Sequence, residues 1–125
     1  MTAVAYQHNG KLMYKDNQFI PLPYDFDMTG WVNPSYAKVN ASLGINSVQE
    51  RIYRGFKRDQ EYFDEVREQF IDKKLELINL VAGFESEFSN PKEFKTMFDF
   101  MNDFYEVLED EDKFEKTIIA KSRTK

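Results

Sequence analysis

The feature that most constrains this fold is a ladder of large apolar side chains that repeats every seven residues. Its members are Phe56, Phe63, Phe70, Leu77 and Phe84. Seven residues make about two turns of an α-helix, so the ladder places all of these side chains on one helix face. The apolar seam on this face also includes Ile52, Val66, Leu80 and Val81. A large apolar face must be buried against another surface. The sequence therefore predicts one long helix over residues 47–82 that packs against a second element.

Local signals set the expected ends of this helix. Ser47 and Glu50 have the spacing of a capping box, in which each side chain accepts a hydrogen bond from the other's backbone N–H. Gly83 is the expected end, because glycine is common just beyond the end of a helix. An unbroken helix of this length would span roughly 54 Å at 1.5 Å per residue, which is long for so small a domain. We therefore expect either a bend at Gly55 or a projecting end that meets a partner.

A second helix is expected near the C-terminal side of the chain. Asn90 and Pro91 form a start signal, with a capping side chain followed by proline in the first turn. Apolar side chains then follow at helical spacing: Phe94, Met97, Phe98, Met101, Phe104, Tyr105 and Leu108. The connection after Gly83 is short, so the two helices should pack antiparallel. The ladder residues from Phe63 to Leu77 are expected to form the core of this helical hairpin.

The N-terminal part of the chain favours strands. Asn9-Gly10 and Asp16-Asn17 tolerate the positive φ angles of type I′ turns, and they separate three short runs of strand-forming residues. Pro21 and Pro23 are expected to end the third strand, because proline cannot donate a hydrogen bond to a neighbouring strand. This pattern predicts a small antiparallel β-meander.

The expected architecture is a single α+β domain over residues 1–125 that is dominated by helix. A short helix should start at Asn33-Pro34 and end at Gly44, ahead of the long antiparallel helical hairpin. The expected parts are an N-terminal β-meander (1–23), a connector (24–33), a helical region (34–110) and a flexible basic tail (113–125).

Composition argues against most catalytic and metal-binding chemistry. The chain has no cysteine and a single histidine, His8, so it cannot form thiolate sites or histidine-rich metal sites. Asp25 and Asp27 flank Phe26, but they lack the other ligands of a calcium loop. We therefore expect no enzyme, no catalytic, metal or cofactor-binding residue, and no cofactor.

Charge is unevenly distributed in a chain whose net charge is −5. The net charge argues against general attraction to nucleic acid or to a membrane surface. The charged residues of segment 51–58 are nevertheless all cations, and residues 106–112 form an acidic run. Each segment is either a solvated face or a docking surface. The candidate partner-binding residues are Arg51, Arg54, Phe56, Lys57 and Arg58.

Residues 34–58 also loosely resemble a helix-turn-helix, in which the second helix enters the major groove of DNA. The resemblance implies a DNA-binding regulator as an alternative function. The favoured expectation is a non-catalytic protein-binding module: an adaptor, assembly factor or inhibitor, with a profile found among phage or mobile-element accessory proteins. We expect a small homo-oligomer that acts in the cytoplasm on a protein partner, because neither a signal peptide nor a membrane span is visible.

Overall fold

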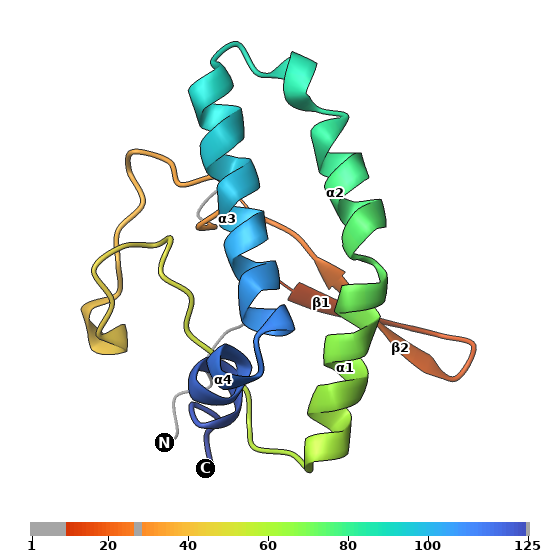
Figure 1. The fold of residues 1–125 in the computed structure, drawn as a ribbon. Coiled ribbons are helices and arrows are strands. Elements are labelled where there is room, and N and C mark those ends of the chain that lie inside the picture. The colour runs from red at the N-terminus through yellow and green to blue at the C-terminus, as the bar shows by residue number, and fades with distance from the viewer. Residues whose placement is uncertain (1–9, 27–28, 125) are drawn as a thin grey trace. The chain divides into compact units, whose positions relative to one another are not determined.

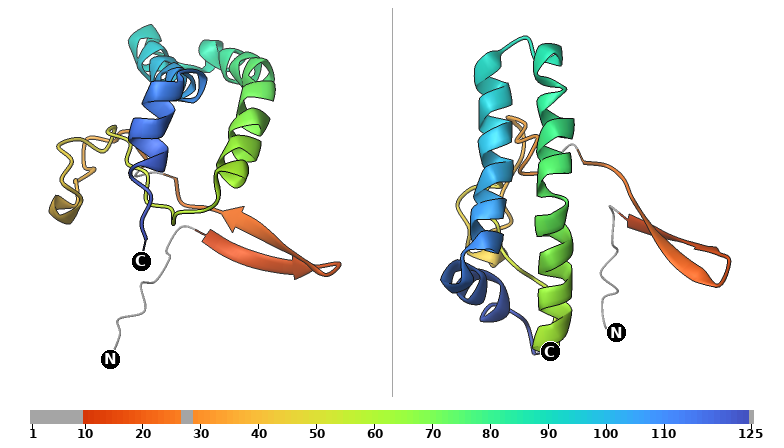
Figure 2. Two further views of the ribbon diagram at one scale, coloured as in Figure 1. Left: turned by 60° about the horizontal axis from the view of Figure 1, so that its bottom comes forward. Right: turned by 45° about the vertical axis from the view of Figure 1, so that its right-hand side comes forward.

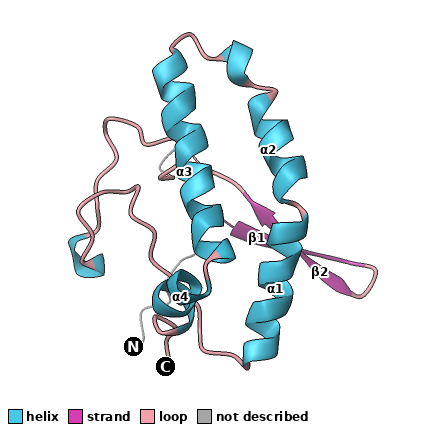
Figure 3. Ribbon diagram, viewed as in Figure 1, coloured by secondary structure: helices cyan, strands magenta, loops and turns pink. Residues whose placement is uncertain are grey.

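The structure is a computed structural model that describes residues 10–26 and 29–124. Contacts within the chain divide it into two units, Met1–Gln49 and Glu50–Lys125. The first unit holds a pair of antiparallel strands and the second holds the long helices (Figures 1 and 3). This arrangement confirms the predicted α+β class dominated by helix.

The strands of the first unit form a β-hairpin. β1 (Gly10–Lys15) pairs antiparallel with β2 (Gln18–Pro23), with Lys15 opposite Gln18 at the turn. Asp16 and Asn17 have φ angles of 51° and 63°, as a type I′ turn requires. The predicted turn is therefore confirmed. The expected strand before it, residues 3–8, lies outside the described residues.

β2 ends at Pro23, as predicted, but Pro21 lies within the strand, opposite Leu12. Within the described residues β2 pairs only with β1, so it has a free edge. A proline is tolerated on an edge strand, where its missing N–H need not serve a neighbour.

The short helix predicted to start at Asn33-Pro34 is reduced to one 3₁₀ turn, η1 (Ala41–Leu43). Asn33 has a φ of 45° and is not an N-cap. Asn40 caps the turn instead, because its side chain accepts a hydrogen bond from the Ser42 backbone N–H at 3.0 Å. Gly44 ends the turn with a φ of 67°, at the predicted position.

The second unit is built on a helical hairpin. Its first arm consists of α1 (Gln60–Asp72) and α2 (Lys74–Ala82), joined through Lys73. After the 3₁₀ turn η2 (Glu85–Glu87), the second arm α3 (Pro91–Glu109) runs antiparallel to the first (Figure 2). Asn90 caps α3 by accepting a hydrogen bond from the Lys92 backbone N–H. The predicted helical hairpin is confirmed.

The first arm begins at Gln60 and not at Ser47. The Ser47 hydroxyl accepts a hydrogen bond from the Gln49 backbone N–H, but no helix follows. Residues 51–59 form no helix, and Phe56 within them forms a parallel β-bridge with Arg123. The Arg123 backbone N–H donates to the Gly55 carbonyl, and the Lys57 N–H donates to the Arg123 carbonyl, both at 2.9 Å. Gly55 therefore lies in a bridge and does not bend a helix.

The predicted tail at 113–125 also differs in the structure. The chain forms α4 (Glu111–Phe114) and a turn of π-helix, η3 (Glu115–Ile119), before it reaches the bridge at Arg123. Phe114 is only 3% exposed, and Ile118 packs against the same core. These two side chains lie four residues apart and so share one helical face.

The core of the second unit lies between the arms of the hairpin and the C-terminal turns. Its buried members among the described residues are Phe63, Val81, Phe94, Met101, Tyr105, Leu108 and Phe114. Of the ladder residues, Phe63 belongs to this buried core. Phe70, in contrast, is 41% exposed, and Phe56 and Phe84 are also exposed. A seven-residue step drifts by about 20° on a straight helix, so successive rungs do not face the same neighbour.

Phe70→Ala is expected to lower the free energy of unfolding by about 1–2 kcal/mol, below the ~3–5 kcal/mol of a fully buried phenylalanine. The remaining cost comes from the edge-to-face contact with Phe104, whose ring centroid lies 5.4 Å away. Urea denaturation at about 1 µM protein measures this change. A loss above ~3 kcal/mol would show that the ring is fully covered in solution.

Tyr105 is the most buried of these side chains, at 2% exposed, and its hydroxyl has no hydrogen-bond partner within the described residues. Burial raises the pKa of Tyr105, and Lys74, 5.4 Å from the ring, partly opposes that rise. Because the folded state disfavours ionisation of this phenol, the stability it contributes is present below about pH 10 and is lost as the pH rises through the raised pKa.

Tyr105→Phe is expected to raise the free energy of unfolding by about 1 kcal/mol at pH 7, because it removes an unsatisfied buried hydroxyl. The variant should also lack the alkaline loss of stability that Tyr105 causes. Denaturation at pH 7 and above pH 10 tests both points. A destabilised variant would mean that the hydroxyl has a partner in solution.

Candidate partner-binding groove

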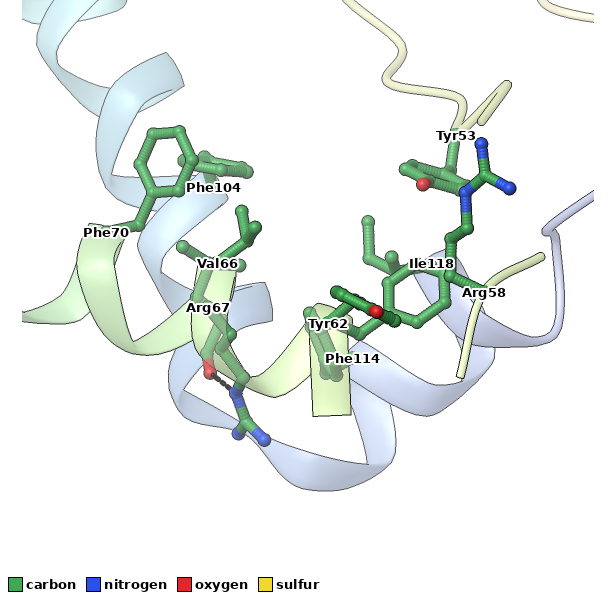
Figure 4. A pocket seen from close by; sticks show the side chains of 11 residues that line it. Tyr53, Arg58, Tyr62, Val66, Arg67, Phe70, Phe104, Phe114 and Ile118 are labelled. Atoms are coloured by element: carbon green, nitrogen blue, oxygen red, sulfur yellow. Dashed lines mark hydrogen bonds between the residues drawn. The ribbon is translucent and has the colours of Figure 1, made fainter. Parts of the chain in front are cut away.

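An apolar cavity of about 300 Å³ lies in the second unit, beside the N-terminal half of α1 (Figure 4). Tyr62, Val66 and Phe70 of α1 form one wall. Phe104 and Leu108 of α3, with Phe114 of α4, form the opposite side and the floor. Elements from three parts of this unit therefore build the cavity.

The α1 wall of the cavity is only partly covered. Tyr62 is 54% exposed and Val66 is 51% exposed. Together with Phe70 they are spaced four residues apart, so they form one stripe along the helix. Lone exposed apolar side chains are ordinary, but a contiguous stripe beside a cavity is typical of an interaction site.

The hollow continues along the first arm. A second hollow of about 280 Å³ is lined by Gln69, Phe70, Lys73, Glu76 and Leu77. Phe70 lines both hollows, so the two hollows adjoin at this residue, one beside α1 and the other reaching α2. We call this surface the α1 groove.

Arg67 joins α1 to the residues of α3 and α4 that form the floor of the α1 groove. Its Nε donates to the Leu108 carbonyl at 2.6 Å, and its Nη1 donates to the Glu111 carboxylate (Figure 4 shows the first of these bonds). The guanidinium also lies 4.6 Å from the ring centroid of Phe114. Arg67 therefore stabilises the fold. Arg58, in contrast, is exposed at the side of the groove, which Tyr53 also lines.

The five predicted partner-binding residues do not form one helical surface, because residues 51–59 form no helix. The Arg51 guanidinium lies 3.6 Å from the ring centroid of Phe100 and donates to the Phe100 carbonyl. Burial lowers the pKa of Arg51, and the charge of Asp103 partly opposes this. Arg51 thus packs against α3.

The other predicted residues remain accessible. Phe56 stacks with the Arg123 guanidinium, 4.5 Å from the ring centroid. Arg54, Lys57 and Arg58 are exposed, and Arg58 lines the groove. Partner binding by these residues stays a prediction, and Arg58 is the member placed at the groove.

The acidic run 106–112 meets cations of its own chain. Glu111 pairs with Arg67 at 2.5 Å, Glu109 with Lys74 at 2.6 Å, and Glu106 with Lys113 at 3.1 Å. Glu106 and Glu109 lie in the last turn of α3, where acids oppose the helix dipole, and their lysine partners offset that repulsion. Three carboxylates of the run thus already have partners.

Residues 34–58, which the structure describes throughout, do not form a helix-turn-helix. Between residues 29 and 59 the described chain has no helix except the 3₁₀ turn Ala41–Leu43. A recognition helix that could enter a major groove is therefore missing from the predicted segment.

The apolar pattern of the sequence placed Val66 and Phe70 on one seam, but it did not include Tyr62. The signal was available in the i, i+4, i+8 spacing, which the seven-residue ladder obscured. No group of histidine and acidic side chains in the described ranges is arranged to hold a metal ion. Nor is any helix among residues 10–26 and 29–124 both long and apolar enough to cross a membrane.

Comparisons with protein-family models, with curated proteins and with solved structures found no match for this chain.

Proposed function

We propose that this chain is a non-catalytic protein-binding module that receives an apolar helix face in the α1 groove. It serves as an adaptor, assembly factor or inhibitor, works as a small homo-oligomer and acts in the cytoplasm. The observation that carries this proposal is the half-exposed stripe of Tyr62, Val66 and Phe70 beside a cavity of about 300 Å³.

The shape of the groove favours a helix over a small molecule. It follows the axis of the first arm through two adjoining hollows, and a partner helix fills such a surface with side chains at i, i+3 and i+4. Its walls are rich in aromatic rings, which contribute most of the binding energy at many protein interfaces.

Charge at the rim adds selectivity. Arg58 lies at the side of the apolar surface, and exposed Arg54 and Lys57 precede it in the chain. A partner that carries carboxylates next to its apolar face would fit this rim, and such charges act mainly on the rate of association.

Site-specific photo-crosslinking tests the proposal. A photoreactive phenylalanine analogue at Tyr62 should give protein adducts in the native host, and the same analogue at Lys92 of α3 serves as an exposed control. Adding Val66→Glu should abolish the Tyr62 adducts, because a charge would enter the apolar stripe. If Tyr62 captures no protein beyond the level at position 92, the groove is not a binding surface.

A further inference from the structure

We infer that the helix received by the α1 groove is α1 of a second copy of this chain, packed antiparallel about a two-fold axis through Val66. This inference rests on the proposed protein-binding function and names the partner. It follows from the spacing and the chemistry of one face of α1.

The face is symmetric in its spacing. Its members are Tyr62, Val66 and Phe70 of α1 with the two residues that cap this helix, Asp59 and Lys73, and they are separated by three, four, four and three residues. At about 100° per residue, Asp59 and Lys73 lie within about 20° of the direction of Val66, and the two aromatic residues lie within about 40°. A two-fold axis through Val66 therefore superposes the face on itself in reverse.

The face is also complementary to itself in chemistry. Antiparallel pairing places Val66 against Val66, Tyr62 of one copy against Phe70 of the other, and Asp59 of one copy against Lys73 of the other. Two-fold symmetry repeats each of the last two contacts. The result is two aromatic pairs around a small central residue, with an ion pair of opposite charges at each end. Binding of an unrelated protein would not require opposite charges at the two ends of this face, whereas antiparallel self-pairing does.

The members of the face are accessible for such a contact. Tyr62, Val66 and Phe70 are about half exposed, and Asp59 is exposed. The Asp59 carboxylate makes no capping hydrogen bond to α1. Lys73 pairs with Glu76 at 2.6 Å, but both side chains are well exposed, at 65% and 69%. Surface pairs of this kind contribute little, so Lys73 can turn to a new carboxylate.

The size of the contact predicts its strength. The face from Asp59 to Lys73 spans roughly 21 Å of helix. A contact of this length buries less surface than a standard interface, which buries about 1,600 Å². We therefore expect a reversible dimer with a Kd on the order of 10 µM. The full chain should be largely dimeric at about 100 µM and largely monomeric at about 1 µM.

Sedimentation velocity of the full chain from about 1 to 200 µM tests this inference. Val66→Glu should leave a monomer throughout, because two carboxylates would meet at the axis. Leu75→Glu is the matched control: Leu75 is an exposed apolar residue of the same arm that lies outside the face, so this variant should dimerise as the wild type does. Far-ultraviolet circular dichroism should show the same helix content in all three proteins.

A charge-swap experiment tests the antiparallel pairing. Asp59→Lys and Lys73→Asp should each raise the dimer Kd by about tenfold, because each places like charges opposite one another at both ends. The double variant restores opposite charges and should return the Kd to within about threefold of the wild type. Lys92→Asp changes the net charge as Lys73→Asp does, away from the face, and should leave the Kd unchanged.

Three results would overturn the inference: a wild type that stays monomeric at 200 µM, a dimer that persists in Val66→Glu, or a double variant that is not restored. A monomeric chain whose Tyr62 analogue still captures another protein would reject the second copy and retain the protein-binding function. Absence of any adduct together with a monomeric chain would reject both.

Discussion

Phe114→Ala lowers the free energy of unfolding by about 3–5 kcal/mol, the largest effect expected from any substitution considered for this chain. The Phe114 ring is 3% exposed, belongs to the buried core and lies on the floor of the α1 groove. Its removal deletes a large apolar side chain that α1, α3 and the C-terminal turns cannot replace without moving. The guanidinium of Arg67 also loses the aromatic ring it lies against.

Urea denaturation followed by circular dichroism measures this loss. Phe84→Ala is the matched control, since Phe84 belongs to the same unit but is 53% exposed, and it should cost less than about 1 kcal/mol. Equal effects of the two substitutions would show that the C-terminal segment does not pack against the hairpin in solution.

The parts of the fold that could be predicted from the sequence are those set by neighbouring residues. Asp16-Asn17 forms its turn because both residues tolerate positive φ angles. Asn90-Pro91 starts α3 because a capping side chain and a first-turn proline act locally. The helical spacing from Phe94 to Leu108 likewise identified the buried face of α3.

The parts that could not be predicted depend on residues far apart in the chain. Residues 51–59 have helix-forming signals, but the backbone groups of Gly55 and Lys57 pair with Arg123 from the opposite end of the unit. This long-range bridge outweighs the local preference for helix, and no periodic pattern in the sequence signals it. Phe114 was overlooked for a similar reason, since a single apolar residue in a charged segment gives no pattern.

The candidate site lies between these two cases. The periodicity placed Val66 and Phe70 on an apolar seam, but it could not show whether another element covers that seam. Coverage depends on where α3 and α4 pack, and they leave the face of Tyr62, Val66 and Phe70 partly open. The seven-residue ladder thus identified the correct helix, while the i, i+4, i+8 stripe identifies the surface.

Replacing Arg67 should have the second-largest effect on stability. The Arg67 side chain is mostly buried, and it joins α1 to the last turn of α3 through the Leu108 carbonyl and to α4 through Glu111 and the Phe114 ring. The last carbonyls of a helix lack partners within the helix, so Arg67 satisfies a group that would otherwise be left unpaired. Arg67→Met keeps the apolar stem but loses the donors and the charge. We expect a loss of about 2–3 kcal/mol, from the unpaired carbonyl and the lost cation–π contact together.

Lys95→Met is the control for this substitution, because Lys95 forms an exposed ion pair with Asp99 and its loss should cost less than about 0.5 kcal/mol. Glu111→Gln should also cost little, since the Glu111 side chain is 75% exposed. If Arg67→Met is as mild as Lys95→Met, the Leu108 carbonyl finds another donor and Arg67 does not hold the groove floor. If the expected loss is found while Glu111→Gln stays mild, the bond to the Leu108 carbonyl and the contact with Phe114 fix the end of α3 against α1. That fixed end keeps the floor of the α1 groove in place for a partner helix.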